Sequence, residues 1–84
     1  MADNNLVVYP NPTAGNLNVN FTAESNTLNV KLMNVAGQLI YNETVEHFSG
    51  TYNSMINIAE QAKGVYFLQI TSDKKVTTQK VVLY

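Results

Sequence analysis

The side chains that could perform catalysis are few in this chain of 84 residues. The single histidine, His47, could in principle activate the hydroxyl of Ser49 or Ser54, but no third group is evident that would orient its imidazole for nucleophilic catalysis. Glu43 and Glu46 are three positions apart, so on a strand they point to opposite faces and cannot act together as acid and base. We therefore expect no catalytic residue and no enzymatic activity.

Metal and cofactor sites are equally poorly supported by the residue types. The chain has no cysteine and one histidine, which excludes a thiolate zinc site and a site made of several histidines. It also has no glycine-rich phosphate loop and no alternating run of acids of the kind that binds calcium. We expect no metal and no cofactor, and without disulfides the fold must be held by packing alone.

The charge of the chain argues against nucleic acid as a partner. The net charge is −1, and all five basic residues are lysines, whereas nucleic-acid-binding domains usually carry a basic excess with arginine. The lysines are concentrated in residues 63–84, either as solvated side chains that protect a strand edge or as a basic tail for an acidic partner. No segment has the roughly 18 consecutive apolar residues that indicate a membrane-spanning helix.

Alternating apolar and polar residues predict strands as the elements that position any site. Residues 64–70 (GVYFLQI) are apolar on both faces, which favours a central strand covered on both sides, with Tyr66, Leu68 and Ile70 on one face. The other strands are expected at residues 6–9, 16–22, 28–32, 38–45, 52–58 and 76–83, separated by turns or loops at 10–15, 24–26, 34–37, 47–50, 59–63 and 72–75. Within 38–45, we expect Leu39, Tyr41 and Val45 to share the inner face.

About seven short strands with turn signals every 8–12 residues are typical of an immunoglobulin-like antiparallel β-sandwich. A small open barrel is the alternative all-β fold. We expect residues 6–84 to form one domain, with residues 1–5 as a disordered linker or a remnant of cloning. A domain of this size has a net stability of only ~3–5 kcal/mol.

Three motifs stand in a fixed order along the chain. They are residues 8–15 (VYPNPTAG), residues 34–38 (NVAGQ), and residues 63–70 (KGVYFLQI) followed by 77–82 (TTQKVV). In order and spacing they resemble the C-terminal sorting domain (type A) of proteins exported by the type IX secretion system of Bacteroidetes. The resemblance extends from about Leu6 to Tyr84.

The resemblance implies an immunoglobulin-like domain that serves as a non-catalytic secretion signal for a larger cargo protein. The implied partners are the outer-membrane translocon, which recognises the folded domain, and a surface sortase that removes it. The implied location is the periplasm in transit to the outer-membrane surface or the medium. The alternative function is a standalone adhesion or carbohydrate-binding module that uses exposed tyrosines.

The resemblance also assigns candidate site residues. The family motifs correspond to Tyr9, Pro10, Asn11, Pro12, Gly15, Gly37, Gly64 and Tyr66. The basic and apolar ending, where the translocon is expected to bind, comprises Lys80, Val81, Val82, Leu83 and Tyr84. Many family members end on lysine or a short polar residue, whereas this chain ends on Leu83 and Tyr84. As a terminal strand, this segment is expected to present a free edge to a partner or to a second copy.

Overall fold

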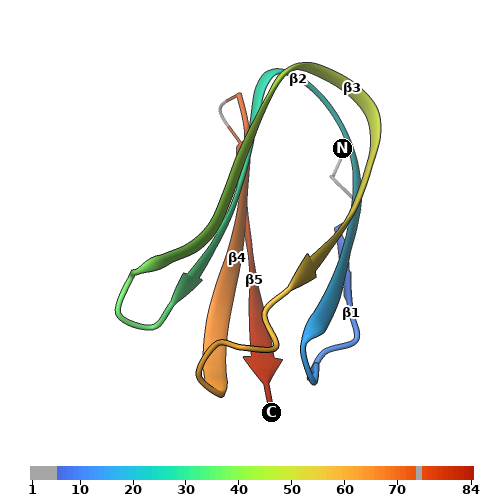
Figure 1. Ribbon diagram of the computed structural model, residues 1–84. Coiled ribbons are helices and arrows are strands. Elements are labelled where there is room, and N and C mark those ends of the chain that lie inside the picture. Colours follow the sequence, from blue (N-terminus) through green and yellow to red (C-terminus); the bar gives the residue numbers. More distant parts are fainter. Residues whose placement is uncertain (1–5, 74) are drawn as a thin grey trace.

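Five antiparallel strands make up the computed structural model, which describes residues 6–73 and 75–84 (Figure 1). The strands are β1 (Val7–Tyr9), β2 (Asn16–Asn34), β3 (Leu39–Asn57), β4 (Gly64–Ser72) and β5 (Lys75–Leu83). The all-β prediction is confirmed, while the linker expected at residues 1–5 lies outside the described part of the chain. In the described part, no helix has the length and apolar character needed to cross a bilayer.

The expected count of seven strands is wrong because two expected pairs of strands are continuous. β2 runs through the turn predicted at 24–26, and β3 runs through the loop predicted at 47–50. The two strands bend together, and their pairing keeps one register from Asn16↔Asn57 to Leu32↔Tyr41. Positive φ angles at His47 (55°) and Gly50 (111°) accompany the bend in β3. The polar residues at 24–26 therefore mark a bend in a paired strand and not a chain reversal.

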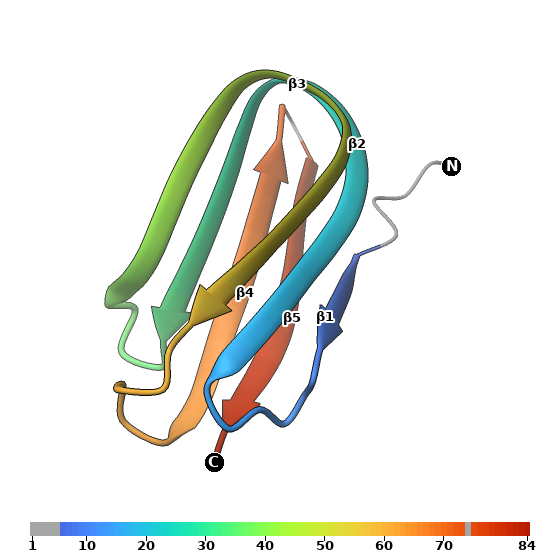
Figure 2. The same ribbon diagram turned by 45° about the vertical axis from the view of Figure 1, so that its right-hand side comes forward.

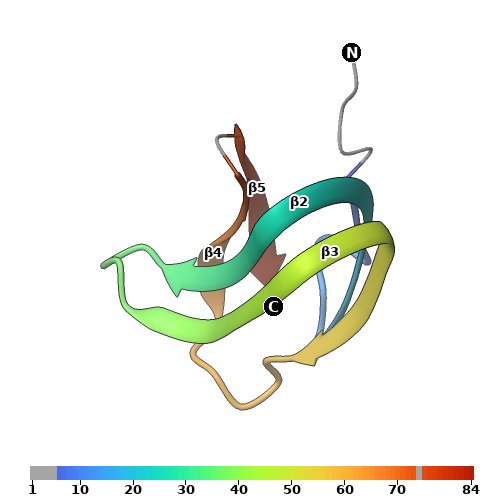
Figure 3. The same cartoon turned by 90° about the horizontal axis from the view of Figure 1, so that it is seen from above.

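The bend folds one sheet into two facing layers (Figures 1 and 3). One layer holds β1, the first part of β2 and the last part of β3. The other holds the last part of β2, the first part of β3, β4 and β5, with β4 between β2 and β5. At the bend, the Asp73 carboxylate accepts hydrogen bonds from the backbone N–H groups of Asn26 (3.1 Å) and Thr27 (3.4 Å). These two hydrogen bonds connect the β4–β5 turn to the bend of β2 and stabilise it.

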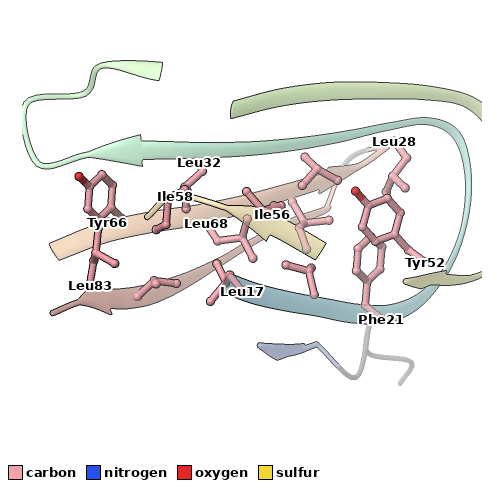
Figure 4. Packing of buried hydrophobic residues seen from close by; sticks show 14 residues of the cluster. Leu17, Phe21, Leu28, Leu32, Tyr52, Ile56, Ile58, Tyr66, Leu68 and Leu83 are labelled. Carbon is pink, nitrogen blue, oxygen red and sulfur yellow. The ribbon is translucent and has the colours of Figure 1, made fainter. Parts of the chain in front are cut away.

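The core lies between the two layers and follows the predicted alternation (Figure 4). Its buried side chains are Leu17, Val19, Phe21, Leu28, Val30, Leu32, Tyr52, Ile56, Ile58, Tyr66, Leu68, Ile70, Val81 and Leu83. Phe21 and Tyr52 stack with ring centroids 4.8 Å apart beside the bend, and Phe48 packs against both rings. Tyr66 lies at the other end of the core.

Two predictions about strand faces are wrong. β4 is internal to its layer, but only one of its faces is covered, and Val65 and Phe67 on the other face remain half-buried at the molecular surface. Tyr41 and Val45 pack against the core as expected, but Leu39 is 51% exposed because the register shifts between Leu32 and Met33. Ile40 packs against the core instead. A bulge of this kind moves the following side chain to the opposite face of the sheet.

Candidate functional site

Segments that are far apart in the sequence meet at one end of the sandwich (Figures 1 and 2). The β1–β2 connection, the β2–β3 turn, the β3–β4 loop and the chain end all lie there, opposite the bend of β2 and β3. We call this the motif end and define it as residues 10–15, 34–38, 58–66 and 80–84. All three sequence motifs contribute to it, and it contains every predicted site residue except Tyr9, which directly precedes it.

The opening motif binds the outer edge of the last strand. The Asn11 side chain donates from Nδ2 to the Lys80 carbonyl (2.8 Å), and its Oδ1 accepts from the Val82 N–H (3.1 Å). The Thr13 N–H donates to the Val82 carbonyl (2.8 Å), and the Thr13 carbonyl accepts from the Tyr84 N–H (2.9 Å). Pro10 and Pro12, each preceded by a cis peptide bond, have no N–H to donate, so the Asn11 amide pairs with β5 in place of backbone groups.

The free edge expected at residues 80–84 is therefore occupied. β4 pairs with one side of this segment, from Gly64↔Leu83 to Phe67↔Lys80, and the opening motif pairs with the other. Strand addition at residues 80–84 would first have to displace Asn11 and Thr13. Among the described strands, β1 and β3 each pair with β2 alone, so these two strands offer edges for pairing between copies.

A second contact of the opening motif fixes it to the end of β3. Thr13 is completely buried; its hydroxyl donates to the Asn16 carbonyl (2.5 Å) and accepts from the Gly15 N–H (3.1 Å). The Gly15 carbonyl accepts from the Ile58 N–H (2.8 Å). A Cβ atom at Gly15 would lie 2.6 Å from Cβ and 3.0 Å from Cα of Ala59. Gly15 was expected to serve a turn, but it is the close approach to Ala59 that requires glycine here.

We predict that Gly15→Ala destabilises the domain by about 1–3 kcal/mol, because the added methyl overpacks against Ala59. Thermal and urea unfolding of the purified domain would measure the loss. Ala14→Ser, at the neighbouring exposed position, is the control and should leave stability unchanged. Adding Ala59→Gly should recover part of the loss, and an unchanged midpoint in Gly15→Ala would contradict the predicted clash.

The middle motif forms the β2–β3 hairpin turn, as predicted. The Asn34 Oδ1 accepts from the N–H groups of Ala36 (3.0 Å) and Gln38 (2.9 Å). Gly37 has a φ of 84°, a conformation that residues with a side chain rarely adopt. The turn lies against the β3–β4 loop, and the two line a cleft with Val35 and Ala36 on one side and residues 62–66 on the other.

The late motif supports the same cleft from β4. Gly64 has a φ of 141° where the chain enters the strand, and the Tyr66 side chain is buried with its hydroxyl donating to the Ala62 carbonyl. Tyr66 pairs with Val81 in the register of β4 and β5. The late motif thus links the β3–β4 loop to the last strand.

The five residues of the chain end divide into two sets. Val81 and Leu83 point inward and are 0% and 1% exposed, so they belong to the core. Lys80 and Tyr84 are exposed and Val82 is half-buried, so only these three offer side chains to a partner. Of the family-motif residues, Tyr9, Pro10 and Pro12 are exposed, whereas Gly15 and Tyr66 are buried.

The sequence interpretation missed a hydrogen-bonded group of one carboxylate and two tyrosines on the inner face of β3. Glu43 is half-buried, and its Oε1 accepts hydrogen bonds from the hydroxyls of Tyr52 (2.6 Å) and Tyr41 (3.0 Å). Burial, together with the hydrogen bond to Glu43, raises the pKa of Tyr52 far above that of a free tyrosine and raises that of Tyr41 as well. Glu43 faces inward because it pairs with the buried Val30 of β2. This pairing could not be predicted from the sequence of β3 alone.

These tyrosines predict a loss of stability in alkaline solution. Because their pKa values are higher in the folded state, the folded protein holds these protons more tightly. The contribution of these two tyrosines to stability should be fully present below about pH 10, the pKa of an unfolded tyrosine, and should be lost as the pH rises above it. Urea unfolding between pH 8 and pH 11.5 measures this, and Tyr52→Phe should make the decline shallower. A decline of equal steepness in Tyr52→Phe would contradict the role given to Tyr52.

The remaining candidates for chemistry do not come together. His47 lies at the bend, far from the motif end, and is exposed to solvent. Residues 6–73 and 75–84 contain no cluster of three or more His, Cys, Asp or Glu side chains that could hold a metal ion. The candidate functional site is therefore the motif end itself.

The comparisons with known proteins bear on the same segments. No curated protein matches the sequence significantly. The sequence profile of one family, described as a secretion system C-terminal sorting domain, matches residues 7–84. This match spans the strands and all the motifs that meet at the motif end. The chain therefore belongs to the secretion system C-terminal sorting domain family.

Proposed function

We propose that this domain is a non-catalytic sorting signal that directs the protein to which it is attached through the type IX outer-membrane translocon. Family membership supports a sorting signal of a secreted protein that reaches the cell surface or the medium. The finer steps belong to the proposal: transit through the periplasm, recognition of the folded domain by the translocon, and removal of the domain by a surface sortase.

The observation that carries the proposal is the meeting of all three motifs at one end of the fold. Residues 10–13 hold residues 80–84 in place, and the middle and late motifs line a cleft beside them. A linear peptide signal would not need such long-range contacts, because its residues would be read in sequence. We therefore infer that the translocon recognises a folded surface, to which Lys80, Val82 and Tyr84 contribute side chains.

A secretion assay tests the proposal. Residues 1–84 are fused to the C-terminus of a reporter with a general export signal and expressed in a strain with a working type IX system. The reporter is expected at the cell surface or in the medium, and in the periplasm of a matched strain without the translocon. A reporter that stays in the periplasm of both strains would refute the proposed function. Loss of the domain from the surface-bound reporter, detected by mass, tests removal by the sortase.

A further inference from the structure

Apolar side chains form a continuous row across the outer face of the β3–β2–β4–β5 layer. The register aligns Leu39, Met33, Phe67 and Lys80 on four successive strands. Val65 and Val82, which pair with each other, lie next to this row on the side of the motif end. We define the outer apolar patch as Met33, Leu39, Val65, Phe67 and Val82. It adjoins the cleft between the β2–β3 turn and residues 62–66.

The patch is confined to one end of the layer. The next row on the same face is Asn42, Lys31, Gln69 and Thr78, and the row after it is Thr44, Asn29, Thr71 and Val76. Seven of these eight residues are polar or charged. A solvated outer face needs polar side chains along its whole length, so a cluster of five apolar residues beside the motifs indicates an interaction site.

Basic side chains lie beside the patch. Lys80 lies in the same row as Leu39, Met33 and Phe67, and Lys31 lies in the next row. The exposed Lys63 lines the adjoining cleft. The motif end also holds one exposed acid, Glu60, so its two lysines, Lys63 and Lys80, leave its side chains with a net positive charge. The patch therefore has a basic border, which complements an acidic partner.

We propose that the outer apolar patch is a docking surface for a protein of the export apparatus whose contact surface is apolar at its centre and acidic at its border. The inference rests on the function proposed above and names the face that the partner binds. Docking on this face leaves Asn11 and Thr13 paired with β5, so it needs no opening of the strand edge.

The burial of the patch favours a protein over a lipid surface. Leu39 is 51% exposed. The other four residues of the patch are half-buried. Insertion into a bilayer needs apolar side chains that protrude beyond the surrounding polar ones. A complementary protein surface can instead make contact with partly buried side chains, as packed interface cores do.

Substitutions of exposed residues test the proposal in the reporter assay. Leu39→Glu is expected to lower the secreted fraction by about tenfold or more, because it places a charge in the apolar contact. Lys80→Glu is expected to lower it by about fivefold, because it reverses one charge of the basic border. Lys80→Arg, which keeps the charge, should stay within about twofold of the unaltered domain. Met55→Glu is the matched control, since Met55 is 63% exposed on the other layer. Thermal unfolding of each purified domain shows that the variants remain folded.

The outcomes separate this inference from the proposed function. If the unaltered domain is not secreted, the proposed function fails. If it is secreted and the folded Leu39→Glu and Lys80→Glu variants are secreted equally well, or no worse than Met55→Glu, the docking surface is refuted. Cosedimentation with phosphatidylglycerol vesicles tests the other class of partner. Binding by the unaltered domain that Leu39→Glu abolishes would make a lipid surface the occupant and overturn the protein partner.

Discussion

Removal of residues 80–84 is expected to unfold the domain and not merely to delete a recognition tail. The truncation removes Val81 and Leu83, which are 0% and 1% exposed in the core. Complete burial of two such side chains contributes about 3–6 kcal/mol, which is comparable to the ~3–5 kcal/mol that stabilises a domain of this size. It also removes the strand to which Asn11 and Thr13 bind.

Circular dichroism and thermal unfolding of the purified 1–79 fragment would measure this effect. Loss of the cooperative transition is expected. Removal of Tyr84 alone is the control, because its side chain is 67% exposed and only its N–H bond to the Thr13 carbonyl is lost. A fragment 1–79 that still unfolds cooperatively near the midpoint of the full domain would show that the last strand is not part of the folding unit.

This expected result changes how secretion assays on the chain end are interpreted. A truncated signal that is not secreted has lost its fold as well as any recognition residue, so the assay does not separate the two. Substitutions at Lys80, Val82 and Tyr84 do separate them, because these side chains point away from the core. Recognition should therefore be mapped with single substitutions and not with deletions.

The strands could be predicted because alternation is a local property. Leu17, Val19 and Phe21 were expected inside and are buried, as are Leu28, Val30 and Leu32. The continuity of β2 and β3 could not be predicted, since Glu24, Ser25 and Asn26 are equally suited to a turn and to a bend. What decides between the two is the pairing of β2 with β3, which is not visible in either segment alone.

The site was predicted as a set of motifs but not as an arrangement. Pro10, Asn11 and Pro12 marked the opening motif, but their contact with Lys80 and Val82 joins positions about 70 residues apart. Such a contact leaves no local pattern in the sequence. Thr13 was not selected for the same reason, because a threonine in a polar connection has no feature that predicts complete burial.

The buried hydroxyl of Thr13 is expected to make a large contribution to the free energy of unfolding. Thr13→Val keeps the shape of the side chain but leaves the Gly15 N–H and the Asn16 carbonyl without this partner. We expect a loss of about 2–3 kcal/mol, since a buried donor without an acceptor retains its full desolvation cost. That is a large part of the total stability of ~3–5 kcal/mol, so the midpoint of urea unfolding should fall strongly.

Thr13→Ser is the matched variant, because it keeps the hydroxyl and removes only the methyl group. It should lose about 1 kcal/mol, the value of one buried methyl, and should keep the two hydrogen bonds. Urea unfolding gives both free energies, and amide hydrogen exchange at Val82 and Tyr84 reports whether the opening motif still holds β5. Faster exchange at Tyr84 in Thr13→Val than in Thr13→Ser is expected, because the Thr13 carbonyl is its acceptor. Equal stabilities of the two variants would show that packing of Thr13, and not its hydroxyl, joins the opening motif to the last strand.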